Sequence, residues 1–183
     1  MSENDITQHG PVLMGMRGSG KSTIAPLLAK LLGMKSLGAD TEIVKRLGIS
    51  IPDMFAQRGE QFFRSAEREI VLELLALRNH VVVLGGGVVL HPEVRSVLKQ
   101  HLTVWLHAPI AVLACRIGGS DRLSLTGKPI QDELADVLAA RKALYQEVAS
   151  LQIDTGWKSP EEAAQIIAEA WKKYDSGGTK EPK

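Results

Sequence analysis

The chain has 183 residues, of which 44% are hydrophobic and 23% charged, as in a soluble globular domain with a core of ordinary size. Its 22 basic and 21 acidic residues leave a formal net charge of +1, so no overall field attracts nucleic acid or a membrane surface, and we expect neither as a partner. We expect one domain over residues 1–183, folded over 11–174, with a disordered tail at 175–183.

The cysteine content and the absence of targeting signals indicate where the chain works. Cys115 is the single cysteine, which excludes an internal disulfide and suits a reducing cytoplasm. It lies in the apolar run AVLACRI, where we expect a buried side chain. No apolar run is long enough to span a membrane, and the polar first ten residues do not resemble a signal peptide. We expect a cytoplasmic monomer.

The first predicted unit is a strand, a glycine-rich turn and a helix over residues 12–32. An apolar run at 12–14 leads into GMRGSGKS at 15–22, and residues 23–32 have the pattern of an amphipathic helix. This is the phosphate-binding sequence GxxxxGK[ST] in the structural context that it requires. Glycines let successive backbone N–H groups point inward at a phosphate, and a helix N-terminus adds a partial positive charge.

This motif predicts a nucleoside triphosphate site. We expect the lysine to reach the β- and γ-phosphates and the serine hydroxyl to ligate Mg²⁺. The residues predicted to bind the nucleotide here are Gly15, Gly18, Ser19, Gly20, Lys21, Ser22 and Thr23.

A second strand is predicted to end in an acidic segment. Residues 34–39 lead into Asp40, Thr41 and Glu42, which we place at the carboxyl end of that strand. An acid beside the γ-phosphate can hold Mg²⁺ through water or accept the proton of a hydroxyl group.

The rest of the chain alternates apolar strands with helices. We expect strands at 81–84, 102–106 and 151–154, and helices at 42–47, 50–59, 60–78, 92–100, 109–117, 132–149 and 160–174. Continuous apolar strands between helices predict an α/β fold, a five-stranded parallel sheet covered on both faces. Ligands then collect at the carboxyl ends of the strands, where the glycine-rich turn, the acidic segment and the glycines at 85–87 fall.

Phosphoryl transfer also needs an acceptor, and three arginines are candidates to bind it. Arg64 and Arg141 are on predicted helices, and Arg122 is in the polar, glycine-containing segment 118–130, which we interpret as a mobile loop beside the site. Arginine forks suit a carboxylate or a phosphate. From the residues alone, an arginine of this kind more often belongs to a solvated helix face than to a ligand site.

Six segments, taken together, resemble the shikimate kinases, which have a P-loop fold like that of the nucleoside monophosphate kinases. The resemblance covers residues 11–156, and its order and spacing are specific. The segments are GMRGSGKST at 15–23, ADTE at 39–42, GEQFFRSAE at 59–67, LGGG at 84–87, GGSDRLSLTGK at 118–128 and RKALY at 141–145. The resemblance implies a three-layer α/β/α core, a lid at 118–130, an acceptor-binding segment at 42–78, and ATP with Mg²⁺.

The resemblance also implies roles at the acidic segment and the lid. Asp40 would help Ser22 hold Mg²⁺, and Glu42 would contact the acceptor hydroxyls as the base. Arg122 would reach the transferring phosphate, and Arg116 would flank the adenine.

The remaining implied roles concern the acceptor. Arg64 and Arg141 would bind its carboxylate, and Glu67, three residues after Arg64 on the same helix face, would orient Arg64. The glycines of the GGG segment would line the acceptor, with the middle one donating a backbone N–H; these are Gly85, Gly86 and Gly87.

Three positions depart from the family pattern. Glu42 stands where the family usually has a second aspartate, which moves the carboxylate out by about 1.5 Å, one C–C bond. Leu123 and Ala143 stand where the family commonly has proline.

The expected activity is ATP-dependent phosphorylation of the 3-hydroxyl of shikimate. A kinase of gluconate or another small hydroxy acid is an alternative, as is a non-catalytic, ligand-sensing domain. The histidines lack a shared spacing for a metal, and we interpret them as loop or strand-end residues: His80, His91, His101 and His107.

Overall fold

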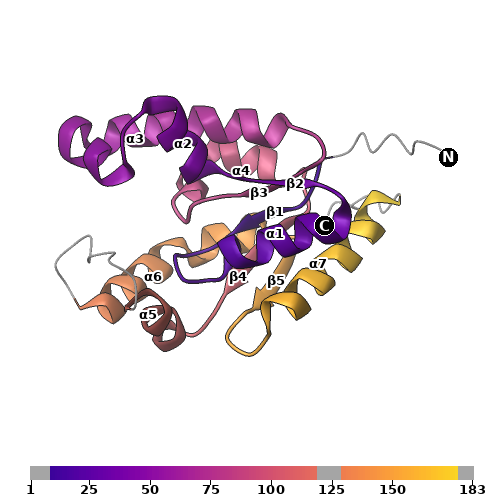
Figure 1. The fold of residues 1–183 in the computed structure, drawn as a ribbon. Coiled ribbons are helices and arrows are strands. Elements are labelled where there is room, and N and C mark those ends of the chain that lie inside the picture. The colour runs from indigo at the N-terminus through magenta and orange to yellow at the C-terminus, as the bar shows by residue number, and fades with distance from the viewer. Residues whose placement is uncertain (1–8, 119–128, 177–183) are drawn as a thin grey trace.

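The computed structural model of this chain describes residues 9–118 and 129–176, which form a parallel sheet between two layers of helices (Figure 1). The strand order is β2-β3-β1-β4-β5, so the expected five-stranded parallel sheet is confirmed, with β5 at an edge. The strands are β1 Val12–Met14, β2 Lys35–Gly38, β3 His80–Val83, β4 Thr103–His107 and β5 Leu151–Asp154. The helices are α1 Lys21–Leu32, α2 Ala39–Leu47, α3 Ile51–Ala76, α4 Pro92–Leu98, α5 Ile110–Gly118, α6 Ile130–Val148 and α7 Pro160–Asp175, with a 3₁₀ turn at Val88–Leu90.

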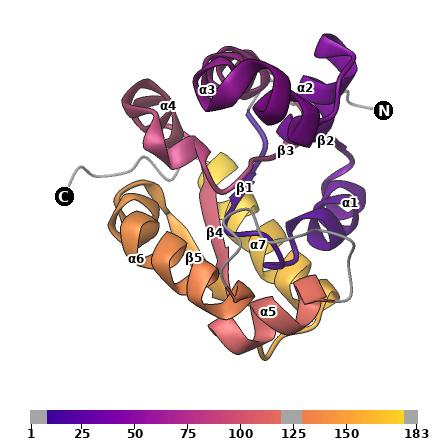
Figure 2. The same cartoon turned by 90° about the vertical axis from the view of Figure 1, so that its left-hand side faces the viewer.

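Each face of the sheet has its own apolar core. Leu13 points to the side covered by α1 and α7, where it packs in a cluster with Leu28 and Ile167. Its neighbours Val12 and Met14 point to the opposite side, into a cluster built largely from α3, α4, α5 and α6. Successive strand residues face opposite sides of a sheet, so these short apolar strands are buried on both faces. Figure 2 shows the two helical layers on either side of the strands.

The strand order places the glycine-rich turn in the middle of the molecule. β1 lies between β3 and β4, and the chain moves outward from it first to one side and then to the other. A reversal of this kind opens a crevice at the carboxyl ends of the strands, which is where α/β proteins bind ligands. The loops after β1, β2 and β3 therefore meet at one edge of the sheet.

Local signals place the helix ends around this edge. The Ser50 hydroxyl accepts the backbone N–H of Asp53 at 3.2 Å and caps α3. Gly59 adopts φ 81°, so the predicted helix end there is a break inside α3 rather than a loop. Gly48 ends α2 with φ 71°.

Three expectations about the elements were wrong. α2 begins at Ala39, so Asp40 and Glu42 belong to its first turn and not to a strand end. Cys115 is exposed on α5, because it lies on the side of that helix opposite Leu113, Ala114 and Ile117, which are buried. The last helix includes Asp175, one residue into the expected tail.

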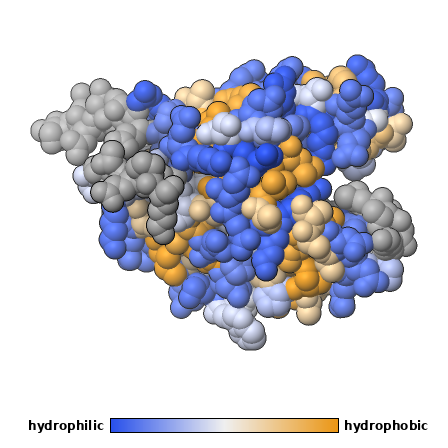
Figure 3. Space-filling model, turned by 180° about the vertical axis from the view of Figure 1, so that it is seen from behind, coloured by the Kyte–Doolittle hydropathy of each residue, from blue (hydrophilic) through white to orange (hydrophobic). Residues whose placement is uncertain are grey.

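The expected lid, with Arg122, lies mainly in 119–128, outside the described residues, as does most of the expected tail. None of the helices in the described ranges is long and apolar enough to cross a membrane. Apolar residues on the face seen in Figure 3 lie in separate patches between polar ones.

Candidate active site

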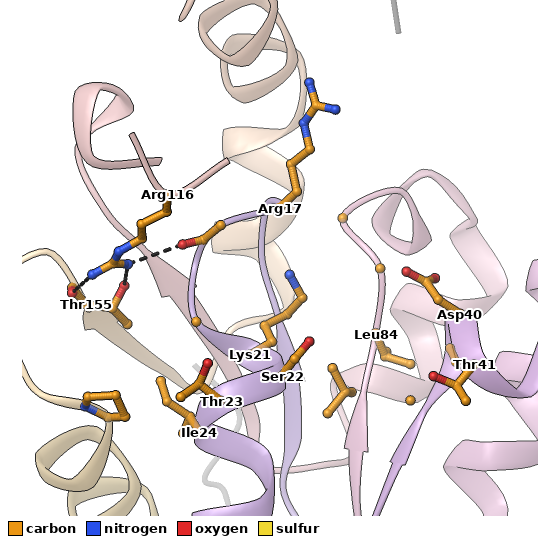
Figure 4. A pocket seen from close by; sticks show the side chains of 18 of the residues that line it. Arg17, Lys21, Ser22, Thr23, Ile24, Asp40, Thr41, Leu84, Arg116 and Thr155 are labelled. Atoms are coloured by element: carbon orange, nitrogen blue, oxygen red, sulfur yellow. Dashed lines mark hydrogen bonds between the residues drawn. The ribbon is translucent and has the colours of Figure 1, made fainter. Parts of the chain in front are cut away.

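A pocket of about 550 Å³ opens between the glycine-rich turn and the loops after β2 and β3 (Figure 4). The turn requires its glycines for two reasons. Gly15, Gly18 and Gly20 have φ of 144°, 78° and 88°, a region that other residues rarely adopt. A Cβ on Gly18 would also lie 3.1 Å from the carbonyl oxygen of Leu113 on the neighbouring α5.

The lysine of the glycine-rich turn is hydrogen-bonded to the backbone of the same turn. Lys21 Nζ donates to the carbonyl oxygens of Gly15 and Met16, at 2.8 Å each. These contacts hold the ammonium group against the backbone of the turn, and Lys21 is the first residue of α1, whose N-terminus favours anions. Arriving phosphate oxygens can replace the two carbonyls as acceptors. The structure therefore places Lys21, Ser22 and Thr23 on one pocket wall, as the motif predicts.

Arg116 of α5, which is expected to flank the adenine, lines the pocket beside the glycine-rich turn. Its guanidinium donates to the carbonyl oxygens of Gly18 at 3.2 Å and Thr155 at 2.7 Å. The buried Thr155 hydroxyl donates in turn to the carbonyl of Ser19 at 3.2 Å. Arg116 thus connects the glycine-rich turn to the segment after β5 (Figure 4).

Asp40 is an acidic side chain on the pocket wall opposite the glycine-rich turn. Asp40 lines the same pocket as Lys21 and Ser22. A Cβ built on Gly85 would lie 3.1 Å from Asp40 Oδ1 and 3.6 Å from Glu67 Oε1, so both carboxylates face the loop after β3. Figure 4 shows Asp40 projecting from the start of α2 toward that loop.

Glu42 does not line this pocket, contrary to the role expected for it. Its Oε1 accepts from Arg46 Nε at 2.9 Å, four residues along α2, and Lys45 lies 3.8 Å from its Oε2. The contact with Arg46 lowers the pKa of the Glu42 carboxyl, so the group stays charged and paired. Two residues on a helix are about 200° apart, so in this helical turn Asp40 and Glu42 cannot face the same ligand.

The residues expected to bind the acceptor include Arg64, which contacts the buried carboxylate of Glu67. Arg64 Nη1 donates to Glu67 Oε2 at 2.7 Å, and its Nε donates to Glu60 Oε1 at 3.2 Å. Within the described part of the chain, Nη2 has no hydrogen-bonding partner. The guanidinium lies against Gly87, where an added Cβ would be 3.2 Å from Nη2. Glu67 therefore contacts Arg64, the side chain that it is expected to orient.

Tyr145 brings the second expected arginine to the same loop. Its hydroxyl donates to the carbonyl oxygen of Gly86 at 2.7 Å. Burial raises the pKa of the Tyr145 hydroxyl, although the neighbouring guanidinium of Arg141 opposes this shift. The tyrosine therefore stays protonated, and Arg141 lies beside a side chain bonded to the loop that Arg64 contacts.

A second link to α6 comes from the glycine-rich turn. Arg17 forms an ion pair with Glu133 in the first part of α6, and the Glu133 side chain is buried. The two residues are 116 positions apart, so the sequence carries no local sign of the pair. Other side chains that sequence reasoning missed are Tyr145, Thr155, Lys158 and Pro160.

The oxygen donors on the pocket walls fit a magnesium ion. The Ser22 hydroxyl and the Asp40 carboxylate line one pocket, and Mg²⁺ prefers a few protein oxygens together with water and substrate phosphates. Among residues 9–118 and 129–176, no group of three or more His, Cys, Asp or Glu side chains gathers as a metal site. Ser22 and Asp40 therefore suit an ion that arrives with the nucleotide.

The fold and the pocket define a P-loop phosphotransferase of the small-molecule kinase class, with the phosphate-binding turn on one pocket wall, and Asp40 with the glycine loop that Arg64 contacts on the other. Comparisons with known proteins agree. The chain belongs to the shikimate kinase family, whose model matches residues 17–172.

Named relatives cover most of this chain. It is 41% identical over 158 residues to a shikimate kinase of Thermobifida fusca. The aligned segment covers 86% of this chain and 91% of that protein. It is 43% identical over 150 residues to a shikimate kinase of Mycobacterium bovis, 81% of this chain and 85% of that protein. A shikimate kinase structure from Acinetobacter baumannii, in complex with shikimate, superposes with a TM-score of 0.85 and 32% identity over 92% of this chain and 96% of the other.

Proposed function

We propose that this chain transfers the γ-phosphoryl group of ATP to the 3-hydroxyl of shikimate, giving shikimate 3-phosphate and ADP. Membership of the shikimate kinase family supports this activity. The observation that carries the site assignment is the single pocket that joins Lys21 and Ser22 to Asp40 and to the loop contacted by Arg64. We further propose a cytoplasmic monomer acting in the pathway to aromatic amino acids.

The phosphate wall would stabilise the charge of the transferring group. The backbone N–H groups of the turn and the N-terminus of α1 bind phosphate oxygens, and Lys21 moves from two carbonyls to the β- and γ-phosphates. Mg²⁺, ligated by Ser22 and held by Asp40 through water, would neutralise phosphate charge when bound, which leaves the Asp40 carboxylate able to accept a proton. Arg116, which lines the pocket and contacts Thr155, would flank the adenine. Arg122 would reach the transferring phosphate.

The acceptor wall would position the hydroxyl. Arg64, oriented by Glu67, and Arg141 would bind the shikimate carboxylate, while the glycine loop lies against the ring. Among the described residues, Asp40 is the acidic side chain that lines the pocket, whereas Glu67 is bonded to Arg64, so we assign to Asp40 the base role that the family resemblance had placed on Glu42. It would take the hydroxyl proton as the oxygen attacks phosphorus.

The first test is ADP release with MgATP in the presence of shikimate, gluconate or quinate. We expect turnover that depends on shikimate and that requires a much higher shikimate concentration in Arg64→Ala and Arg141→Ala. ATP binding without turnover on shikimate would sink this proposal, and turnover on gluconate instead would replace the acceptor.

The second test separates the two acids. A general base contributes about 10²- to 10⁴-fold, so Asp40→Asn should lower kcat by at least about 10²-fold. Glu42→Gln, two residues away on the same helix, is the matched control and should retain kcat within about threefold, since surface substitutions have small effects. A large loss in Glu42→Gln with activity kept in Asp40→Asn would contradict the assignment.

A further inference from the structure

His91, which the sequence indicated only as a loop residue, contacts the buried carboxylate of the acceptor wall. Its Nε2 lies 3.2 Å from Glu67 Oε2, the oxygen that also accepts from Arg64 Nη1 at 2.7 Å. The Glu67 side chain is 2% exposed and that of His91 14% exposed. Arg64, Glu67 and His91 therefore form one continuous contact from the pocket wall into the protein.

His91 stands at a helix N-cap, but its side chain contacts Glu67 and does not cap the helix. It is the N-cap residue of α4, with φ −87° and ψ 113°, yet its side chain makes no capping hydrogen bond. Asparagine, aspartate, serine and threonine are the residues that cap a helix best. The imidazole is turned toward Glu67 instead.

The chemistry of the contact fixes the role of the ring. A carboxylate oxygen can only accept, so Nε2 must carry the hydrogen that points at Glu67. A charged group buried to this extent needs hydrogen-bond donors, and His91 supplies one to the same oxygen that holds Arg64.

The other partner of Arg64 is a weaker restraint. Glu60, which accepts from Arg64 Nε, has a side chain that is 65% exposed. Exposed ion pairs hold side chains poorly because solvent screens them and long side chains lose entropy on pairing. The direction of the Arg64 fork therefore depends mainly on Glu67, and the Glu67 carboxylate depends on His91.

We infer that His91 is a positioning residue for acceptor binding, acting through Glu67 on Arg64. The inference rests on the proposed function, because it takes Arg64 as the group that binds the acceptor carboxylate. A carboxylate remote from the reacting hydroxyl is bound alike in the ground state and the transition state, so loss of His91 should raise the KM for shikimate and leave kcat unchanged.

The test uses two replacements that differ in where they place an amide N–H. In His91→Gln the side-chain nitrogen reaches about as far as Nε2, so the donor to Glu67 is kept. In His91→Asn it reaches only as far as Nδ1, so the donor is lost, but asparagine is a better N-cap for α4. A positioning role favours glutamine, whereas a merely structural role at the start of α4 favours asparagine.

We expect the shikimate KM of His91→Asn to rise about tenfold, the factor that corresponds to losing one buried hydrogen bond. His91→Gln should stay within about twofold of the wild type, and both variants should keep kcat and the KM for ATP within about twofold. Thermal unfolding of His91→Asn should occur near the wild-type temperature, because the better N-cap of α4 offsets the loss of the donor to Glu67.

Two controls show whether the effect runs through Arg64. His80→Asn changes a histidine at the opposite end of β3, where the ring contacts the carbonyl of Arg78, and it should leave the shikimate KM unchanged. Adding His91→Asn to Arg64→Ala should change KM by less than about twofold, since residues of one network are not additive.

Each outcome decides the question. If Arg64→Ala raises the shikimate KM and neither His91 variant does, the role of His91 is refuted and the proposed function stands. A fall in kcat at unchanged KM in His91→Asn also refutes it, as does an equal rise in KM for the glutamine variant. A wild type without shikimate-dependent turnover overturns the proposed function and this inference together.

Discussion

Replacing Gly87 with alanine would test the acceptor wall by displacing a single side chain. Gly87 has φ −87° and ψ −16°, which any residue adopts, so alanine brings no backbone strain. The new methyl group would lie 3.0 Å from Arg64 Cζ and 3.2 Å from Nη2, and closer still to Nη1. Nonbonded atoms pack best at about 3.5–4.0 Å, so the guanidinium must move by about 1 Å. Arg64 is flexible at this end, and the fold should be retained.

The displacement gives an expected magnitude. A charge-assisted hydrogen bond contributes about 1.5–3 kcal/mol, and each 1.4 kcal/mol is a factor of ten in affinity. Gly87→Ala should therefore raise the KM for shikimate by about 10- to 100-fold. The KM for ATP should stay within about twofold, because the turn that binds phosphates is not touched.

The assay is steady-state ADP release over a range of shikimate concentrations, with thermal unfolding as the check on folding. The control is the same substitution in an Arg64→Ala background, where the methyl group meets no guanidinium. There it should add less than about 0.5 kcal/mol, about twofold in KM. Full additivity of the two substitutions, or an unchanged KM in Gly87→Ala alone, would refute the argument that Arg64 binds the acceptor from this position.

Two further predictions concern stability. The pKa of Glu42 is lowered in the folded chain, chiefly by the hydrogen bond from Arg46. This contact therefore stabilises the fold fully when the pH is above 4.5, the ordinary pKa of the group. The stabilisation is lost as the pH falls through the lower pKa of the folded state. The difference in free energy of unfolding between wild type and Glu42→Gln, measured with urea, should shrink toward zero on acidification; a difference independent of pH would contradict it. Tyr145→Phe removes the buried donor to Gly86 O and should lower the free energy of unfolding by about 1–2 kcal/mol, whereas unchanged urea unfolding would show that this bond contributes nothing.

The phosphate wall was accessible to sequence reasoning because its requirements are local. Glycines at 15, 18 and 20 permit positive φ, and Lys21 follows directly at the start of α1. Apolar strands between helices likewise predict a parallel sheet, and its strand ends bring the turn, the acidic segment and the glycine loop together. The pair Arg64 and Glu67 could be found for a similar reason, since three residues on a helix share a face.

The acidic segment shows what such reasoning could not decide. Residues two apart share a face on a strand and lie on opposite sides of a helix, so the position where β2 ends determines which carboxylates reach the ligand. The strand ends at Gly38 and α2 begins at Ala39, which directs Asp40 into the pocket and leaves Glu42 with Arg46. The hydrophobic pattern of a sequence does not locate the end of a strand or the start of a helix to better than a few residues, so it could not place this boundary between Gly38 and Ala39.

By itself the sequence determined the family, the parallel sheet and the phosphate-binding turn, because those depend on short-range spacing and backbone freedom. Only the tertiary structure decided which acid lines the pocket and which side chains contact Arg64. The contact between His91 and Glu67 joins residues 24 positions apart on different elements. It forms because packing of α3 against α4 buries a carboxylate that needs a donor, and no local pattern specifies which residue supplies it.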